Sequence, residues 1–271
     1  MDTGFLKLNN AGSAPMTSLP CPPFAEFRKM LIDAVRTRGW HVASFFAMPK
    51  EEDRTRLIAV LTDDASACLR LLSSYVSGSY AALTPECAQF HWFEREIFEQ
   101  TGIIPEGHPW LKPIRFTDPE TKPGVTDYFH LHGSAAHEVA VGPVHAGVIE
   151  PGHFRFQCMG EDVYTLEISL GYQHRGIEKM LRGGPDKKTL HVMETVAGDT
   201  STASAGAYCR ILEALDPESR VSARSEAIRA IAWELERIAN HIGDLGALAG
   251  DVAYLPTASY CGRIRGEFLN M

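Results

Sequence analysis

The sequence contains no pair of cysteines at Cys-x-x-Cys spacing. Metal ions and iron–sulfur clusters are usually held by two thiolates from one short turn. We therefore expect no metal or cluster site that is built by this chain alone. The six cysteines are scattered, and we interpret them as small apolar residues in a reducing compartment: Cys21, Cys68, Cys87, Cys158, Cys209 and Cys261.

Basic charge and long apolar runs are also scarce. The formal net charge is −8, and nucleic-acid binding needs a basic patch, so we expect no nucleic-acid partner. No run approaches the roughly 18 uncharged apolar residues that span a bilayer, so any membrane association would come through partners. Residues 1–16 lack the basic and apolar regions of a signal peptide, and we therefore expect a cytoplasmic protein.

The sequence also lacks a dinucleotide-binding fingerprint. No G-x-G-x-x-G opens a helix after a strand, and Arg182-Gly183-Gly184-Pro185 is better interpreted as a helix stop. We therefore expect no nucleotide to bind this chain by itself.

What the sequence does contain is a Gly- and Pro-rich stretch with ionisable side chains at 142–153. Glycine and proline hold the backbone in turns, so that polar side chains can face a ligand. This stretch carries His145, Glu150 and His153. An alternating pattern follows it at 154–169 and predicts a β-hairpin.

The first half of the chain predicts a small α+β domain at 24–116, in which helices cover one face of a mixed sheet. Apolar residues at helical spacing predict a helix at 24–38. Asp63 or Asp64 can cap a second helix, and residues 1–23 are expected to be loose. The other predicted elements are strands at 40–48, 57–61 and near 80–83, a helix at 67–76, and a short aromatic helix within 86–115.

Residues 117–137 have turn-formers and charges but no sustained period, and we place a linker there. Its histidines, His130, His132 and His137, are interpreted as surface or linker residues rather than metal ligands.

The second domain, at 138–271, is predicted to hold the hairpin and a helical bundle. We expect helices at 174–181, at 189–215 with a break near Gly198, and at 222–248, where one apolar stripe indicates packing in a bundle. The final residues still look helical, so we expect this domain to be truncated at Met271.

Both halves carry motifs that resemble one family. Residues 90–115, FHWFEREIFEQTGIIPEGHPWLKPIR, resemble the signature of the 30-kDa peripheral-arm subunit of respiratory complex I. Residues 142–271 resemble the N-terminal part of the 49-kDa subunit and of the large subunit of energy-converting nickel–iron hydrogenases. The matching pieces are GPVHAGVIEPGHFRF, LGYQHRGIEK and AIAWELERIANHIGDLGALAGDVAY. Fusion of the two modules is typical of formate-hydrogenlyase-type and hydrogenase-4-type large subunits.

The chain departs from the hydrogenase pattern at its metal ligands. The resemblance places Ala197 and Thr200 where those enzymes have the two cysteines of R-x-C-G-x-C, and Ser204 where they have a histidine. Alanine has no donor atom, and a neutral hydroxyl cannot replace a bridging thiolate. We therefore do not expect a nickel–iron centre, although a second cysteine pair would lie beyond Met271.

The resemblance also implies roles for individual residues. His145, Glu150 and His153 are candidates for binding an acceptor or transferring protons, because histidine titrates near neutral pH. The alternative is that both histidines only fix the loop and that Glu150 is a surface carboxylate.

Four further residues are candidates for lining a cavity or lying near a partner's cluster. Arg175 and Glu178 are alternatively structural, and Asp199 and Thr200 alternatively cap a helix.

The function implied by the resemblance is that of a subunit of a membrane-associated oxidoreductase, at the inner face of the cell membrane. It would scaffold electron transfer from iron–sulfur clusters of a small subunit to a quinone or related acceptor, next to other peripheral-arm and membrane-arm subunits. NAD and the clusters would belong to partner subunits. The alternatives are a true energy-converting hydrogenase large subunit and a redox-inactive assembly or coupling subunit.

Overall fold

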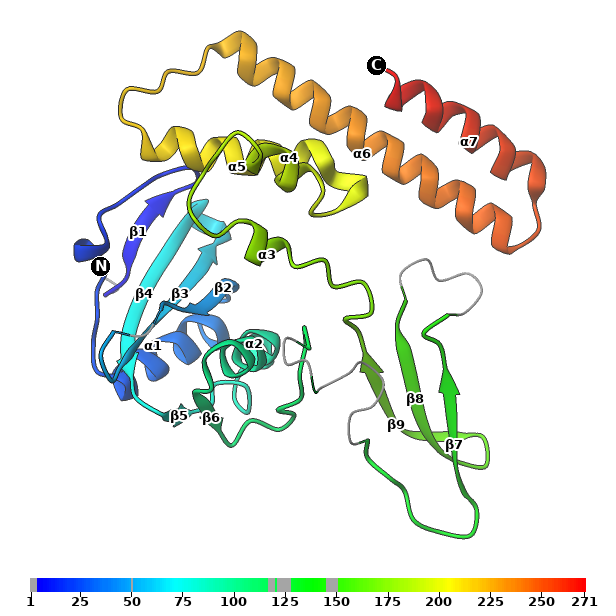
Figure 1. Ribbon diagram of the computed structural model, residues 1–271, viewed down its shortest axis with the longest axis horizontal. Coiled ribbons are helices and arrows are strands. Elements are labelled where there is room, and N and C mark those ends of the chain that lie inside the picture. The colour runs from blue at the N-terminus through cyan, green and yellow to red at the C-terminus, as the bar shows by residue number, and fades with distance from the viewer. Residues whose placement is uncertain (1–3, 50, 117–119, 121–127, 145–150) are drawn as a thin grey trace. The chain divides into compact units, whose positions relative to one another are not determined.

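The structure, a computed structural model, describes residues 4–49, 51–116, 120, 128–144 and 151–271 (Figure 1). It divides into two compact units, Met1–His174 and Arg175–Met271. The first contains all the β-sheets of the described residues and the second is helical, so the predicted α+β class is confirmed.

The first unit begins with a four-stranded antiparallel sheet and a covering helix. The strand order is β1-β4-β3-β2. Helix α1 (Phe24–Arg36) places Phe27, Leu31 and Ala34 on one face, and all three are fully buried in the core. This i, i+4, i+7 spacing explains why the helix forms against the sheet. The strands are β1 (Leu6–Asn9), β2 (His41–Ala47), β3 (Thr55–Asp63) and β4 (Cys68–Val76).

Two predictions for this domain were wrong. The segment 67–76, predicted as a helix, is strand β4, and its register with β3 runs from Asp63↔Cys68 to Thr55↔Val76. Residues 6–9, predicted as loose, are strand β1 and pair with β4. Both errors arise because strand pairing is not visible in a local pattern: β1 pairs with the distant β4, and β4, whose own pattern fits a helix equally well, lies between β1 and β3.

Asp63 does act as a cap, but of a shorter element than predicted. Its carboxylate accepts the N–H of Ser66 at 3.2 Å, at the start of the one-turn 3-10 helix η2 (Asp64–Ser66). Arg70 also binds this carboxylate, at 2.9 Å. The cap therefore turns the chain from β3 into β4.

The aromatic helix is confirmed as α2 (His91–Thr101), and Gly102 ends it with a φ of 74°. Its Ile97, together with Phe90 of the preceding 3-10 helix η3 (Ala88–Phe90), lies in the core, whereas Trp92 stays exposed. Strand β5 (Ser79–Ala81) pairs in parallel with β6 (Ile104–Glu106) beside it. A further 3-10 helix, η1 (Met16–Ser18), precedes α1.

Another sheet of this unit has three antiparallel strands in the order β7-β8-β9. The predicted hairpin is confirmed as β8 (His153–Met159) and β9 (Asp162–Ser169). Strand β7 (Ala136–Val141) was not predicted, and it falls partly in the expected linker.

In this sheet the polar face is buried and the apolar face is exposed, which is the reverse of the usual arrangement. Cross-strand partners share a face, so His153, Arg155 and Gln157 lie with Ser169, Glu167 and Thr165. This polar face is mostly buried. The other face carries apolar residues, of which these are exposed: Val139, Val141, Tyr164, Leu166 and Ile168.

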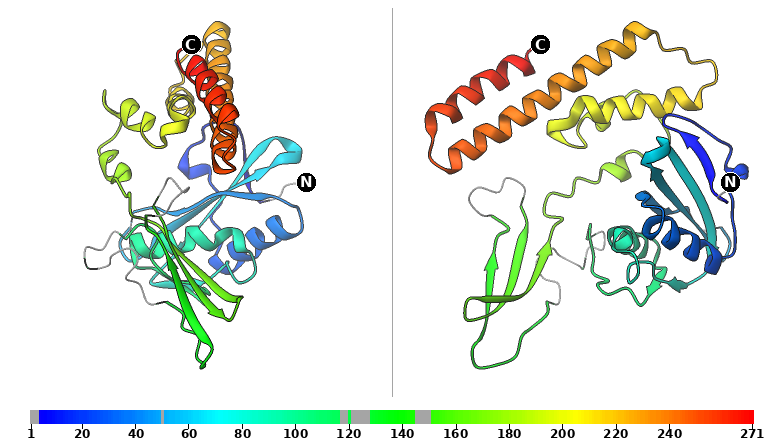
Figure 2. Two further views of the ribbon diagram at one scale, coloured as in Figure 1. Left: turned by 90° about the vertical axis from the view of Figure 1, so that its right-hand side faces the viewer. Right: turned by 180° about the vertical axis from the view of Figure 1, so that it is seen from behind.

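The second unit consists of helices, and Figure 2 shows the long hairpin that α6 makes with α7. The predicted break near Gly198 is confirmed, because the 3-10 helix η4 (Gly198–Thr200) separates α4 from α5. Helix α6 begins after Ser222, whose side chain accepts the N–H of Ser225. The helices are α3 (Ile177–Met180), α4 (Thr189–Glu194), α5 (Ser201–Leu215), α6 (Ala223–Asp251) and α7 (Leu255–Leu269).

Glycines allow these helices to approach closely. A Cβ at Gly206 of α5 would lie 2.7 Å from the ring of Trp233 on α6. A Cβ at Gly243 of α6 would lie 3.1 Å from Arg265 on α7, and one at Gly246 would lie 3.0 Å from Cys261. The predicted apolar stripe of α6 is only partly covered, since its Ile228, Ile231 and Leu245 remain more than half exposed.

The predicted domain limits differ from these compact units. The sequence places the boundary between the two modules in the linker 117–137, and the limits of these modules stay a prediction. The structure groups the three-stranded sheet with the first unit, because Lys112 and Tyr128 contact its strand β9. Within the described parts of the chain, no helix is long and apolar enough to cross a membrane.

Candidate functional site

The predicted site residues fall in two separate places. His153 lies in the first unit, whereas Arg175, Glu178, Asp199 and Thr200 lie in the second. His145 and Glu150 lie outside the described residues, so their predicted roles stay predictions. We therefore describe two regions, each within its own unit.

His153 is held at the start of β8 with a defined tautomer. It is 7% exposed, and its Nδ1 lies 3.1 Å from the backbone carbonyl oxygen of Gly142. A carbonyl oxygen only accepts, so Nδ1 carries the hydrogen and donates it. In the neutral ring, Nε2 is then a bare acceptor. This atom is buried and has no hydrogen-bond partner among the described residues.

Tyr128 and Ser169 complete the surroundings of His153. Ser169 is the cross-strand partner of His153, and its hydroxyl lies 3.1 Å from the hydroxyl of Tyr128. The rings of Tyr128 and His153 are 5.7 Å apart between centroids. Arg155 and Lys112 lie over the Tyr128 ring, at 4.7 and 5.6 Å. The histidine is therefore flanked by an aromatic ring that two cations contact.

The buried polar face is explained by the segment that docks on it. Side chains of the sheet accept backbone N–H groups of this segment: Glu167 from Phe129 at 2.9 Å and Gln157 from Leu131 at 3.1 Å. Buried backbone donors need such partners. Side chains of the polar face thus provide the hydrogen-bond acceptors that a neighbouring strand would otherwise offer to the backbone of 128–131. No rule based on alternating residues in the sequence would have found this.

In the second unit, Arg175 holds the turn that follows α4. Its guanidinium donates to the carbonyl oxygens of Thr195 at 2.6 Å and Val196 at 2.9 Å. The last carbonyls of a helix lack intrahelical partners, and a cation suits them. Arg175 therefore binds backbone carbonyls of this turn, and both its structural role and its place near a partner's cluster stay predictions. Glu178 lies on α3 and is exposed.

Asp199 and Thr200 lie in the turn between α4 and α5, which α6 and α7 fix in place. Asn240 donates to the backbone oxygen of Asp199 at 2.7 Å, and Arg265 to its carboxylate at 3.2 Å. Thr200 is the N-cap residue of α5, but its side chain makes no capping hydrogen bond. That part of the helix-capping alternative was wrong.

The cap of α5 comes instead from Glu236 on α6. Its two carboxylate oxygens accept the N–H groups of Thr202 at 2.7 Å and Ala203 at 3.0 Å. The sequence alone indicates no role for Glu236, Asn240 or Arg265. One signal was available, because Glu236 and Asn240 are four residues apart in sequence and lie off the apolar stripe of α6.

The residues at 197–200 do not fit a nickel–iron centre. Ala197 has no donor atom, and the carboxylate of Asp199 is held by Arg265. A bridging site needs soft thiolates, which the turn does not offer. Over the residues that the structure covers, no three His, Cys, Asp or Glu side chains are grouped so that they could hold a metal ion.

Comparison with known proteins relates both modules to redox complexes. Residues 26–128 match the family described as the 30 Kd subunit of respiratory-chain NADH dehydrogenase. The chain is 31% identical over 239 residues to hydrogenase-4 component G of Escherichia coli (strain K12), which is 78% of this chain and 40% of that protein. It is 31% identical over 194 residues to formate hydrogenlyase subunit 5 of the same strain, 62% of this chain and 33% of the relative.

A third relative carries the name of the respiratory enzyme. The C/D protein of NADH-quinone oxidoreductase from Bacteroides thetaiotaomicron is 27% identical over 216 residues, 66% of this chain and 40% of the relative. The chain spans less than half of the length of these three relatives.

The fold and the matches define a fused, two-module protein with an α+β module followed by a sheet and helices. The chain belongs to the family of fused 30-kDa/49-kDa-like subunits found in complex I-like and hydrogenase-4-like oxidoreductases. The resemblance inferred from the sequence motifs is thereby confirmed.

Proposed function

We propose that the chain is a subunit of a membrane-associated oxidoreductase complex in which it scaffolds electron transfer from iron–sulfur clusters to a quinone or related acceptor. The observation that carries the proposal is the joint match of both modules, since relatives named for hydrogenase-4 and for NADH-quinone oxidoreductase cover most of this chain. Clusters and NAD would belong to partners, which would include an iron–sulfur small subunit, other peripheral-arm subunits and membrane-arm subunits. The complex would lie at the cytoplasmic face of the cell membrane.

His153 supports the acceptor role through its geometry. Reduction of a quinone to a quinol takes two electrons and two protons, and each carbonyl oxygen gains one proton. Because Nδ1–H is committed to Gly142, the buried Nε2 is the ring atom that would carry a proton to an acceptor oxygen. His145 and Glu150, which precede His153 in the sequence, are proposed to share this task. Arg175, Glu178, Asp199 and Thr200 are proposed to shape the surroundings of the partner's cluster.

The test is quinone reduction by the complete complex, purified through a tag on this chain, with a reduced viologen dye as electron donor and a short-chain quinone as acceptor. His153→Gln should lower kcat by about 100-fold if the imidazole transfers the proton. His132→Gln is the matched control, since His132 is exposed. Unchanged turnover of the His153 variant in a normally assembled complex would rule out this role.

A true hydrogenase is the second candidate, because two relatives at 31% identity are named for hydrogenase-4 and formate hydrogenlyase. Against it stand Ala197 and Thr200, which lack thiolates. This candidate requires stoichiometric nickel in the purified complex. Elemental analysis of the same preparation separates the two proposals.

A third candidate is an assembly or coupling subunit without redox chemistry. Replacing His145 and His153 together should then leave turnover of the complete complex intact. A sharp loss of turnover with normal assembly excludes this candidate.

A further inference from the structure

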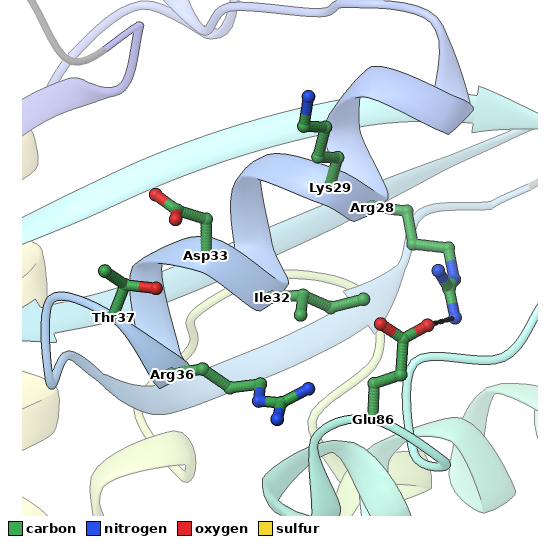
Figure 3. A pocket seen from close by; sticks show the side chains of 7 residues that line it. All are labelled: Arg28, Lys29, Ile32, Asp33, Arg36, Thr37 and Glu86. Atoms are coloured by element: carbon green, nitrogen blue, oxygen red, sulfur yellow. Dashed lines mark hydrogen bonds and ion pairs between the residues drawn. The ribbon is translucent and has the colours of Figure 1, made fainter.

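We propose that Lys112 and Glu167 are a positioning pair through which the first domain fixes the sheet that carries His153. The pocket beside α1 in Figure 3 is open to solvent, and its Arg28 is already bound to Glu86. The junction around Lys112, in contrast, combines an ion pair to a buried carboxylate, a small cavity and a close backbone approach.

Lys112 is held on the side of the first domain. Arg95 of α2 donates to the carbonyl oxygens of Lys112 at 2.7 Å and Pro113 at 2.9 Å. Glu99, also on α2, accepts the N–H groups of Ile114 and Arg115 at 3.0 and 2.9 Å. The backbone at 112–115 therefore moves with α2, whose Ile97 lies in the core.

Glu167 is held on the side of the sheet. Its side chain is 5% exposed, and its Oε2 lies 2.9 Å from Nζ of Lys112. The other oxygen accepts the N–H of Phe129. A carboxylate this buried needs a cation and donors around it, and loss of one partner leaves an uncompensated charge. The position of Glu167 is thus set by Lys112 and by the docked segment together.

The connection from Glu167 to His153 is short. On β9, Glu167 is two residues from Ser169, which pairs with His153 in register. Ser169 also contacts the hydroxyl of Tyr128, whose ring lies against both His153 and Lys112. A displacement of Glu167 therefore reaches His153 along β9 and through Tyr128.

Gly171, just after β9, provides a second and independent contact between the three-stranded sheet and the segment 112–116. A Cβ at this glycine would lie 2.9 Å from the ring of Phe116 and 3.3 Å from the backbone oxygen of Ile114, and its φ is +98°. A small cavity is lined here by Lys112, Phe116, Glu167 and Ser169. The sheet thus approaches the 112–116 segment too closely to move freely.

The test compares two ion pairs of the same unit in the full chain. Lys112→Met removes the positioning pair. The control is Arg70→Met, because Arg70 binds the buried carboxylate of Asp63 at the same 2.9 Å but has no contact with the three-stranded sheet in the described structure. The readout is the nitrogen NMR spectrum of the histidine rings, in which His153→Gln identifies the signals of His153.

We expect Lys112→Met to shift or broaden the two ring-nitrogen signals of His153, because the Nδ1–H bond to Gly142 is perturbed, and Arg70→Met to leave them in place. Should Lys112→Met fail to fold, Gly171→Ala perturbs the same junction without changing a charge and should give the same shift. Unchanged His153 signals in both variants, or an equal shift in Arg70→Met, would overturn the proposal.

A second part of the test, quinone reduction by the complete complex, rests on the proposed acceptor role. Failure of that role and failure of the positioning pair give different results. In the complete complex, Lys112→Met should lower kcat for quinone reduction more than it raises KM, by less than His153→Gln does, and Lys112→Arg should restore part of the loss. An NMR response in a chain whose wild-type complex reduces no quinone would refute the proposed function and leave the positioning pair intact.

Discussion

The carboxylate of Glu94 accepts two hydrogen bonds from Thr84, one from the backbone N–H at 3.0 Å and one from the hydroxyl at 2.6 Å. It also accepts the N–H of Leu83 at 2.8 Å, and it is fully buried. Burial raises the pKa of Glu94, while these hydrogen bonds lower it. Glu94 thus ties the aromatic helix α2 to the loop after β5.

Glu94→Gln should destabilise the first unit. An amide has a single acceptor oxygen, so its NH₂ group would face a backbone N–H, at a cost of about 1–3 kcal/mol in the free energy of unfolding. Urea titration measures the change. Glu86→Gln is the control, since Glu86 is 44% exposed and pairs with Arg28, and its expected effect is below about 1 kcal/mol. Equal effects of the two variants would contradict the role assigned to Glu94.

The stability of the first unit should fall in mild acid because of His91 and His108. Burial lowers the pKa of both, and Arg95 adds to this. The unfolded chain therefore binds more protons below the ordinary value of 6.5, so stability is complete above that pH and declines as pH falls below it. Urea titrations at about pH 7.5 and about pH 5.5 measure the loss.

The pH prediction has its own control. His108 accepts the N–H of Trp110 through Nδ1, and its Nε2 contacts the carbonyl oxygen of His91. His108→Gln removes one titrating ring and should reduce the acid sensitivity. His132→Gln, at an exposed site, should leave it unchanged. An acid sensitivity that both variants retain in full would have another origin.

Gly206→Ala should destabilise the second unit. The added Cβ would lie 2.7 Å from the ring of Trp233, and overpacking of this kind costs about 1–3 kcal/mol. Gly266→Ala is a matched control within α7, where a Cβ meets no atom within 4 Å. It should stabilise the helix by up to about 1 kcal/mol through helix propensity. Thermal unfolding of the two variants should thus show opposite shifts of Tm.

Glu236→Ala should loosen the turn that carries Asp199. The N–H groups of Thr202 and Ala203 lose their acceptor, and loss of an N-cap typically costs about 1 kcal/mol. Hydrogen exchange of these two amides reports the loss directly. Glu234→Ala, which removes only the exposed pair with Arg237, should leave their exchange unchanged. Slow exchange retained in Glu236→Ala would show that another group caps α5.

The helices were predictable because their signals are local. In α1 and α6, apolar residues recur at helical spacing, and in α2 the stop at Gly102 is a glycine with positive φ. Strands β1 and β4 were missed because each depends on pairing with residues elsewhere in the chain. The sequence of β4 fits a helix as well as a strand, and only its neighbours β1 and β3 decide between them.

The same division holds for the candidate site. The chemistry of His153 and the missing thiolates at Ala197 and Thr200 can be read from residue types alone. Lys112, Tyr128 and Glu236 could not be assigned, because their partners Glu167, Ser169 and Thr202 lie 55, 41 and 34 residues away. Contacts over such separations leave no periodic signal.

The sequence by itself determined the α+β class, the positions of most helices, the family and the absence of thiolates where a nickel–iron centre would need them, since these depend on residue identity and short-range spacing. The tertiary structure alone decided which tautomer His153 adopts and that the polar face of its sheet is the buried one. Both follow from where Gly142 and the segment 128–131 come to lie. Buried polar atoms must be satisfied by whichever groups folding places beside them.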